Sequence, residues 1–272
     1  MKRLFFLTMI WLASISYGYA EGPTLMMATT TSTESTGLLD YLAPHFEKDT
    51  GITLKWVAVG TGKALEYGKN CDVDVLLVHA PAAEMEYVNQ GYGIDRKEVM
   101  YNDFIIIGPE SDPAAIKNLS AREALAAIRA LKANFISRGD QSGTHKMELS
   151  LWKEAGIPTP DKDSWYIQAG QGMLMTINMA AEKNGYTLTD RGTYITYEKT
   201  MNGAPPLKIL VANDSRLFNQ YSVIIVNPKN CPQVKPGPAK EFSDWITGKG
   251  AQALIGNYMF QGKALFMPNA GK

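Results

Sequence analysis

Two runs of the sequence share one pattern: FIIIGP at residues 104–109 and SVIIVNP at residues 222–228. Each places four bulky apolar residues before a turn residue and a proline, which is typical of a strand buried on both faces. We interpret these runs as the two places where the chain crosses between lobes. The chain ends, 21–102 and 228–272, then form lobe I, and the insert, 103–227, forms lobe II. Two crossovers make a hinge, and the cleft between the lobes is a natural ligand site.

The rest of the chain repeats a unit of strand, polar turn and helix. Apolar residues recur at helical spacing from Leu38 to Phe46, and Pro44 inside this pattern predicts a kink or an early break. Ser120 and Glu123 have the spacing of a capping box ahead of another helix. The alternation of strands and helices predicts an α/β fold with a parallel sheet.

Residues 1–20 have the pattern of a secretory signal peptide. Lys2 and Arg3 precede a mostly apolar segment, and Gly18 and Ala20 place small residues before the expected cleavage point. We therefore expect a periplasmic protein released by cleavage. The full chain has 27 Lys and Arg against 27 Asp and Glu, so loss of Lys2 and Arg3 would leave it slightly acidic. This balance gives no basic field for nucleic acid, which we exclude as a partner.

The chain has two cysteines, Cys71 and Cys231. In an oxidising compartment they could form a disulfide, and the alternative is a pair of buried thiols. The sequence gives no geometry that decides between the two, and neither cysteine has the spacing of a metal site.

Four polar turns each follow an expected strand and precede an expected helix, at residues 29–33, 60–62, 137–144 and 186–194. Such turns lie at the carboxyl ends of strands in a parallel sheet, where ligands bind. A helix N-terminus offers unpaired N–H groups, and neighbouring hydroxyls add donors, so together they bind oxyanions. Ordinary helix capping is the alternative for any one turn. Several turns together, one with consecutive threonines, favour an anion site.

Arg138 and Arg191 each lie in one of these turns, in lobe II. A guanidinium group makes bidentate bonds to oxyanions and keeps its proton, so both are candidate anion contacts. A surface ion pair is the alternative for either residue. Asp140 could cap a helix, orient Arg138 or accept a proton from a protonated anion.

An enzymatic reading fits the same stretch less well. Residues 139–143, GDQSG, resemble a serine-protease nucleophile run, but Gln141 interrupts it. His145 is also too close in sequence to be the base of a triad. We therefore do not expect an enzyme and keep an exported hydrolase only as an outside hypothesis.

Two further groups are assigned to structural roles. His45, His79 and His145 are far apart in the sequence, so we expect core or surface positions and no cation site. The Met-rich segment 173–175 is expected in the core.

Six segments stand in order along the chain: ATTTST (28–33), VAVGTG (57–62), VLLVH (75–79), VMYNDF (99–104), SRGDQSGTH (137–145) and YTLTDRGTY (186–194). Together they resemble the periplasmic tungstate-binding proteins of tungstate ABC importers, over nearly the whole expected mature chain. The sequence departs from that family at residues 70–74, where NCDVD replaces an expected Gly-Asp-Ala-Asp, and at Ala80, where Asp is frequent.

The resemblance implies a two-lobed type II periplasmic-binding fold that closes over one dehydrated tungstate dianion. It also implies delivery of that ligand to an ABC permease, by a monomer that needs no cofactor. The anion contacts that it and the polar turns indicate are Thr30, Thr31, Ser32, Thr61, Arg138, Ser142, Gly143, Thr144 and Arg191.

The chemistry of the ligand is less sharply defined by the residues themselves. A site of donors and arginines favours a fully ionised tetrahedral anion and disfavours a protonated one, unless Asp140 turns inward. Tungstate and molybdate are nearly equal in size and charge, so the resemblance alone selects tungstate. A receptor for molybdate, sulfate or phosphate with the same fold is the alternative.

Overall fold

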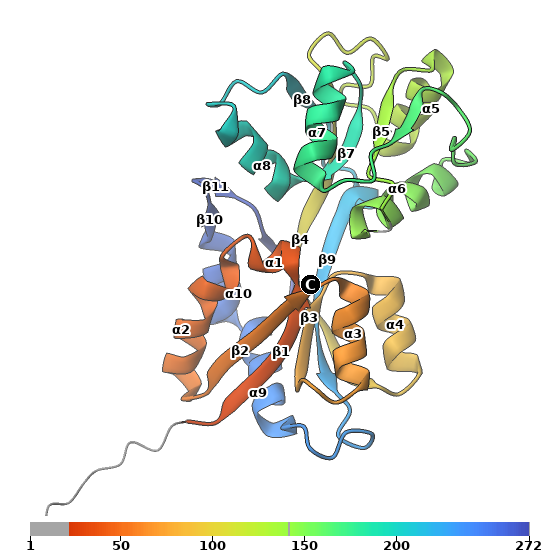
Figure 1. Ribbon diagram of the computed structural model, residues 1–272. Coiled ribbons are helices and arrows are strands. Elements are labelled where there is room, and N and C mark those ends of the chain that lie inside the picture. The colour runs from red at the N-terminus through yellow and green to blue at the C-terminus, as the bar shows by residue number, and fades with distance from the viewer. Residues whose placement is uncertain (1–21, 141, 272) are drawn as a thin grey trace, which may run out of the picture.

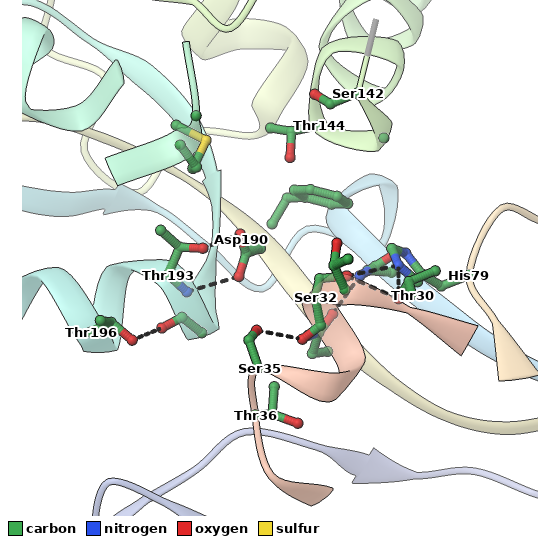
Figure 2. Close-up of a pocket in the computed structure, with 18 of the residues that line it drawn as sticks. Thr30, Ser32, Ser35, Thr36, His79, Ser142, Thr144, Asp190, Thr193 and Thr196 are labelled. Carbon is green, nitrogen blue, oxygen red and sulfur yellow. Dashed lines mark hydrogen bonds between the residues drawn. The ribbon is translucent and has the colours of Figure 1, made fainter. Parts of the chain in front are cut away.

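The computed structural model describes residues 22–140 and 142–271, which form two α/β lobes joined by two extended strands (Figure 1). The expected signal peptide, 1–20, lies outside the described residues. The lobes face each other across the cleft whose walls Figure 2 shows at close range. Within the described residues, no helix is long and apolar enough to cross a membrane.

Lobe I is built on one sheet whose strands, in spatial order, are β2 (Thr53–Val59), β1 (Thr24–Thr30), β3 (Val75–Val78), β9 (Phe218–Val226), β4 (Gly93–Pro109) and β12 (Met267–Pro268). β1 is parallel to β2 and β3, and β9 runs antiparallel to both β3 and β4. The remaining elements of the lobe are α1 (Thr31–Glu34), α2 (Leu38–Thr50), α3 (Thr61–Lys69), α4 (Pro81–Asn89), α9 (Pro236–Thr247), α10 (Lys249–Asn257), β10 (Met259–Phe260) and β11 (Lys263–Ala264).

Lobe II is built around the far half of β4, which pairs antiparallel with two strands of the insert. Its strands are β5 (Phe135–Ser137), β6 (Tyr166–Gln168), β7 (Thr187–Asp190) and β8 (Leu207–Val211). Its helices are α5 (Ala121–Leu131), α6 (Gly143–Glu154), α7 (Met173–Glu182), α8 (Arg191–Thr200) and the 3-10 turn Ser215–Leu217. β5 pairs in parallel with β6 and touches the start of β7 through a Phe135–Tyr186 bridge.

The two apolar runs lie on β4 and β9, the strands that connect the lobes, but they belong to different sheets. β4 pairs with β9 as far as Asp103 and with β7 from Phe104 onward, so the chain enters lobe II at this point. The run at 222–226, in contrast, lies wholly in the lobe I sheet, between β3 and β4. The predicted end of lobe II at residue 227 is therefore too late, because the returning crossover precedes β9. An apolar run shows that a strand is buried and does not show in which sheet.

Each lobe has an apolar cluster on both faces of its sheet, as the alternation along β9 illustrates. Val223 and Ile225 pack in one cluster with α2, α9 and α10, while Ile224 and Val226 pack in the other with α3 and α4. Strand side chains alternate between faces, so a strand covered by helices on both sides is apolar at every position. This burial fixes β9 beside β4, and the far half of β4 continues into lobe II.

Two sequence expectations in lobe I can be compared with the structure. Helix α2 continues past Pro44, so the predicted break does not occur. Pro44 and Asp40, whose carbonyl lacks its helical donor, are both exposed, and water can supply the missing bond. Cys71 and Cys231 are joined by a disulfide, with Cα atoms 5.4 Å apart. Of the two alternatives left open for the cysteines, the structure has the covalent one.

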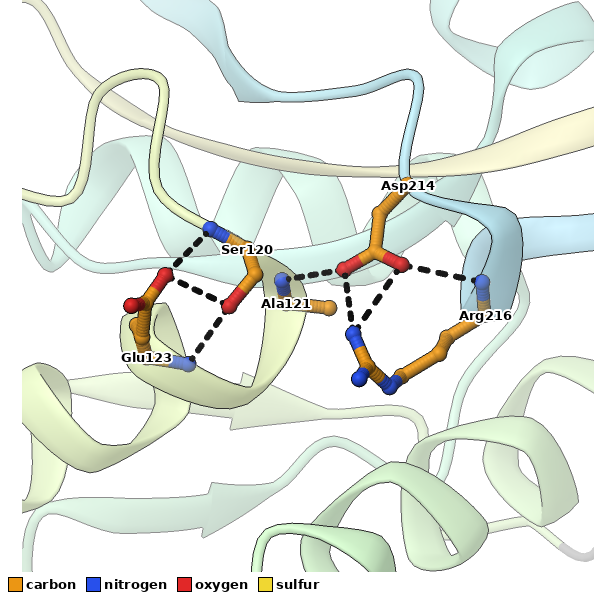
Figure 3. A network of polar contacts seen from close by, with 5 residues as sticks. All are labelled: Ser120, Ala121, Glu123, Asp214 and Arg216. Atoms are coloured by element: carbon orange, nitrogen blue, oxygen red, sulfur yellow. Dashed lines mark hydrogen bonds and ion pairs between the residues drawn. The ribbon is translucent and has the colours of Figure 1, made fainter.

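The start of helix α5 is capped twice (Figure 3). Ser120 and Glu123 form the predicted capping box, each bonding the other's backbone N–H. In addition, Asp214 accepts a hydrogen bond from the Ala121 N–H at 2.8 Å and from the Arg216 N–H at 3.0 Å. Asp214 therefore ties the chain that returns from β8 to the first turn of α5.

Replacing Asp214 with Ala is expected to lower the free energy of unfolding by about 1–3 kcal/mol at pH 7, since two backbone donors lose their acceptor. Burial raises the pKa of Asp214, but the bonds from Arg216 and Ala121 outweigh burial and hold that pKa below its usual value. The contribution is therefore present above the unfolded pKa of about 3.9 and is lost as pH falls through the lower folded pKa.

Urea unfolding at pH 7 and at pH 3 measures this contribution. The exposed Asp163, on a lobe II turn, supplies the matched control Asp163→Ala, which should leave stability within about 0.5 kcal/mol of wild type. An Asp214→Ala protein as stable as the control at pH 7 would show that the cap adds nothing.

Candidate functional site

A cavity of about 720 Å³ lies between the lobes and is lined by residues of both. Figure 2 shows Ser142 and Thr144 of lobe II on one side, with Thr30, Ser32 and His79 of lobe I across from them. The predicted site residues that line this cavity are Thr30, Thr31, Ser32, Thr61, Arg138, Ser142, Gly143 and Thr144. The structure therefore brings together polar turns that are far apart in the sequence.

Helix N-termini are the main feature of the cavity wall. α1, α3, α6, α7 and α8 all begin there, each directly after a strand or a short turn. Ser142 caps α6 by accepting from the His145 N–H at 3.3 Å. The N-cap residues of α3 and α7 are glycines, Gly60 and Gly172, which have no side chain to accept from the first-turn N–H groups. These two helix ends consequently keep donors available for a ligand.

Arg138 contributes the positive charge on the lobe II side. Its guanidinium group pairs with Asp140 on the same turn, and its side chain is 18% exposed. The Nε atom is buried without a hydrogen-bond partner among the described residues. An unsatisfied buried donor is destabilising by about 1–3 kcal/mol, more when it is charged. In the wall of a cavity, such a donor is a place for the oxygen of an anion.

Asp140 is turned towards its own loop. Its Oδ1 accepts from the Ser142 N–H at 3.1 Å, and its other oxygen bonds Arg138. Burial raises the pKa of Asp140, but the bonds from Ser142 and Arg138 outweigh burial and hold that pKa below its ordinary value. Of the roles considered for it, Asp140 therefore orients Arg138, while Ser142 caps the helix, and Asp140 is outside the cavity lining.

The carboxylate that does line the cavity is Asp190, at the start of α8. Both of its oxygens accept from Thr193, at 2.8 Å from the backbone N–H and 2.6 Å from the hydroxyl (Figure 2). As the sequence predicts, Asp190 caps this helix. Because each oxygen already accepts one bond from its own helix, Asp190 is a weaker acceptor for a proton from a ligand than a free carboxylate would be.

Arg191 is placed differently from the prediction. Its Nε donates to Asp103 Oδ1 at 2.6 Å, and the same guanidinium bonds the second oxygen of that carboxylate. Asp103 strengthens the positive form, which raises the pKa of Arg191. Arg191 does not line the cavity, because Asp103, at the point where β4 leaves lobe I, holds it against the hinge. The sequence could not show this pairing, since 88 residues separate the two.

His79 is one of the polar residues of the cavity that the sequence reasoning did not assign to the site. It follows β3 and lines the cavity, where its Nε2 lies 3.0 Å from Thr30 Oγ1 and 3.1 Å from Ser32 Oγ. Its Nδ1 lies 2.8 Å from Asn219 Oδ1, and its ring stacks on Tyr221. The segment VLLVH could have indicated this position, because it places a histidine directly after the carboxyl end of a buried strand.

The start of α7 was also assigned wrongly. Met173 is buried, as expected of a core residue, but Leu174 and Met175 are 40% and 57% exposed and line the cavity. The glycines just before the helix, Gly170 and Gly172, could have indicated a ligand-facing helix start. A glycine N-cap has no side chain to accept from the first-turn N–H groups, which are then available to a ligand. Among residues 22–140 and 142–271, no group of three His, Cys, Asp or Glu side chains lies together as a cation site requires.

The chain is similar in sequence and structure to known proteins. Residues 18–249 match the model of the PBP superfamily domain. The tungstate-binding protein TupA of Peptoclostridium acidaminophilum is 50% identical, covering 91% of this chain and 86% of its own. The structure of TupA from Desulfovibrio alaskensis G20 is 62% identical with a TM-score of 0.90, covering 92% of this chain and all of that one. A tungstate ABC transporter structure from Geobacter sulfurreducens is 47% identical with a TM-score of 0.74, covering 86% and 98%.

Proposed function

The chain belongs to the PBP superfamily and, within it, to the tungstate-binding proteins of ABC transporters, with their type II periplasmic-binding fold, and from this premise we propose that its cleft holds the tungstate dianion. The protein is a solute-binding protein that captures tungstate for an ABC importer. The observation that carries the site assignment is the buried Nε of Arg138, which has no partner among the described residues and belongs to a cavity wall that also holds helix N-termini and hydroxyls.

The proposed contacts come from both lobes, so the anion would bridge them. Arg138, Ser142 and the first turn of α6 face it from lobe II, and Thr30 to Ser32 and Thr61 face it from lobe I. A tetrahedral dianion presents four acceptor oxygens, and a ring of N–H, O–H and guanidinium donors satisfies them without water. Binding would draw the lobes together about the β4–β9 axis, because each lobe supplies only part of the ring.

Partner and location follow from the transporter family. We propose that the loaded protein docks on the membrane permease of the importer and acts outside the cytoplasmic membrane, where the expected signal peptide would send it. The proposal includes no catalysis, and Ser142, the serine of the protease-like run, uses its oxygen as a helix cap.

Calorimetric titration of anion-stripped protein with tungstate, molybdate, sulfate and phosphate tests the proposal. Tungstate is expected to bind at least about tenfold more tightly than phosphate, a difference of about 1.4 kcal/mol, because hydrogen phosphate brings a proton for which the wall offers no free carboxylate. Tighter binding of molybdate or sulfate would keep the receptor and reject tungstate as its ligand. Absence of binding to all four anions would reject the site and reopen the hydrolase hypothesis.

A further inference from the structure

The hydrogen bonds around His79 fix which of its nitrogens carries the proton. Asn219 Nδ2 donates to Asn102 Oδ1 at 2.7 Å, so the atom that Asn219 turns to His79 is its carbonyl oxygen. That oxygen is an acceptor, and His79 Nδ1 must therefore donate. Asn102 and Asn219 face each other on β4 and β9, so the hinge itself sets this tautomer.

The other nitrogen, Nε2, is left as an acceptor for two hydroxyl groups. Thr30 Oγ1 and Ser32 Oγ lie 3.0 and 3.1 Å from it, and both residues line the cavity. A neutral imidazole has one lone pair there, and a hydroxyl that donates to it has no hydrogen left for a ligand. A neutral His79 therefore takes a hydroxyl hydrogen away from the side of the site that an anion would use.

A proton on Nε2 reverses this arrangement. The imidazolium then donates to a hydroxyl oxygen and takes no hydrogen from one. The exposed Ser32 can turn its hydroxyl hydrogen into the cavity, while the buried Thr30 Oγ1 keeps a hydroxyl neighbour in its own lobe, Thr33 Oγ1 at 2.6 Å. An anion bonded to the Ser32 hydroxyl lies one hydroxyl away from Nε2, roughly 5–6 Å, which is close enough for its two negative charges to favour the imidazolium.

We propose that His79 is a positioning residue of the anion site, and that tungstate binds together with one proton, which passes from solvent to His79 Nε2. This inference rests on the proposed function, because it concerns the anion held in that cleft. No covalent bond changes: one proton leaves the buffer and one N–H bond forms.

The surroundings of His79 are consistent with a neutral ring before binding and a charged one after it. Burial lowers the pKa of His79, against the bond with Asn219 and the charge of Asp190, which raise it. The other titratable neighbour is Tyr221, stacked on the ring at 4.7 Å and fully buried, where desolvation keeps its hydroxyl protonated. Arg138 lines the same cavity from lobe II and opposes a second positive charge until an anion lies between them.

Calorimetry at one pH in buffers of different ionisation enthalpy tests the proposal, followed by affinity measurements from pH 6.5 to 8.5. Tungstate binding is expected to take up a proton, and its affinity to rise as pH falls, by up to about tenfold per pH unit. His79→Gln should still bind tungstate, with no proton uptake and a nearly constant Kd. His45→Gln is the matched control, because His45 packs against Tyr41 on α2, outside the cavity, and should behave as wild type.

Each outcome bears on a separate statement. A binding heat that is independent of the buffer, or proton uptake that persists in His79→Gln, would overturn the role of His79 while leaving tungstate binding intact. If His79→Gln does not fold, NMR titration of the wild-type histidines decides, since the His79 ring should gain its proton only when tungstate is present. Failure of the wild-type protein to bind tungstate at any pH would instead reject the proposed function.

Discussion

Tungstate affinity is expected to fall by about 10²–10³-fold when Arg138 is replaced by Ala, because truncating one partner of a buried, hydrogen-bonded charge pair is worth about 2–5 kcal/mol. The substitution removes the unpartnered Nε donor and one positive charge from the cavity wall. It also leaves the ionised Asp140 unpaired beside the site, where it repels a dianion. Calorimetry or competition with a labelled anion measures the loss.

Three companion variants separate these causes. Arg138→Lys keeps the positive charge but not the planar guanidinium group, and its tungstate affinity should lie between those of wild type and Arg138→Ala. Adding Asp140→Asn to Arg138→Ala removes the repulsion and should recover only part of the affinity. Arg129→Ala, on the exposed face of α5, should bind as wild type.

Two results would contradict this assignment. An Arg138→Ala protein within twofold of wild type would show that the guanidinium does not touch the anion. Complete recovery in the double variant would show that Arg138 only neutralises Asp140. Either result would leave the helix N-termini as the source of affinity.

Loss of the Cys71–Cys231 disulfide is expected to lower the free energy of unfolding by about 3–5 kcal/mol, because the bond closes a long loop in the unfolded chain. The bond links the turn after α3 to the segment between β9 and α9, 160 residues later. Both segments belong to lobe I and neither cysteine lines the cavity, so tungstate affinity should stay within about twofold of wild type.

Urea unfolding of the oxidised protein, the reduced protein and a Cys71→Ser, Cys231→Ser variant measures the effect. The reduced protein and the variant should unfold at the same urea concentration, well below that of the oxidised protein. Equal midpoints for all three would mean that the packing around Cys231 already fixes the two segments. A large loss of affinity in the double variant would mean that the bond also shapes the cleft.

Local sequence patterns predicted the elements of this fold well where the cause was local. Ser120 and Glu123 predicted a capping box that the structure has, and Asp190 predicted the cap of α8. The polar turns at 29–33, 60–62 and 137–144 predicted helix starts, and all three now line one cavity. In each case the residues that create the feature are neighbours in the chain.

Apart from the break predicted at Pro44, the predictions that the structure does not bear out depend on partners that are distant in sequence. The run at 222–226 showed a buried strand, but its pairing with β3 and β4 placed it in lobe I. Arg191 has the chemistry of an anion contact, yet Asp103 holds it at the hinge. Leu174 and Met175 have the chemistry of core residues, yet the position of α7 turns them to the cavity.

The sequence by itself therefore determined the α/β class, the caps and the donors available for an oxyanion. Periodicity, capping and charge act over a few residues, so they can be read along the chain. Only the tertiary structure decided which sheet β9 joins, that Cys71 bonds Cys231, and that His79 meets Thr30 and Ser32. Those choices depend on the summed burial and hydrogen bonding of whole lobes, in which residues more than 40 positions apart become neighbours.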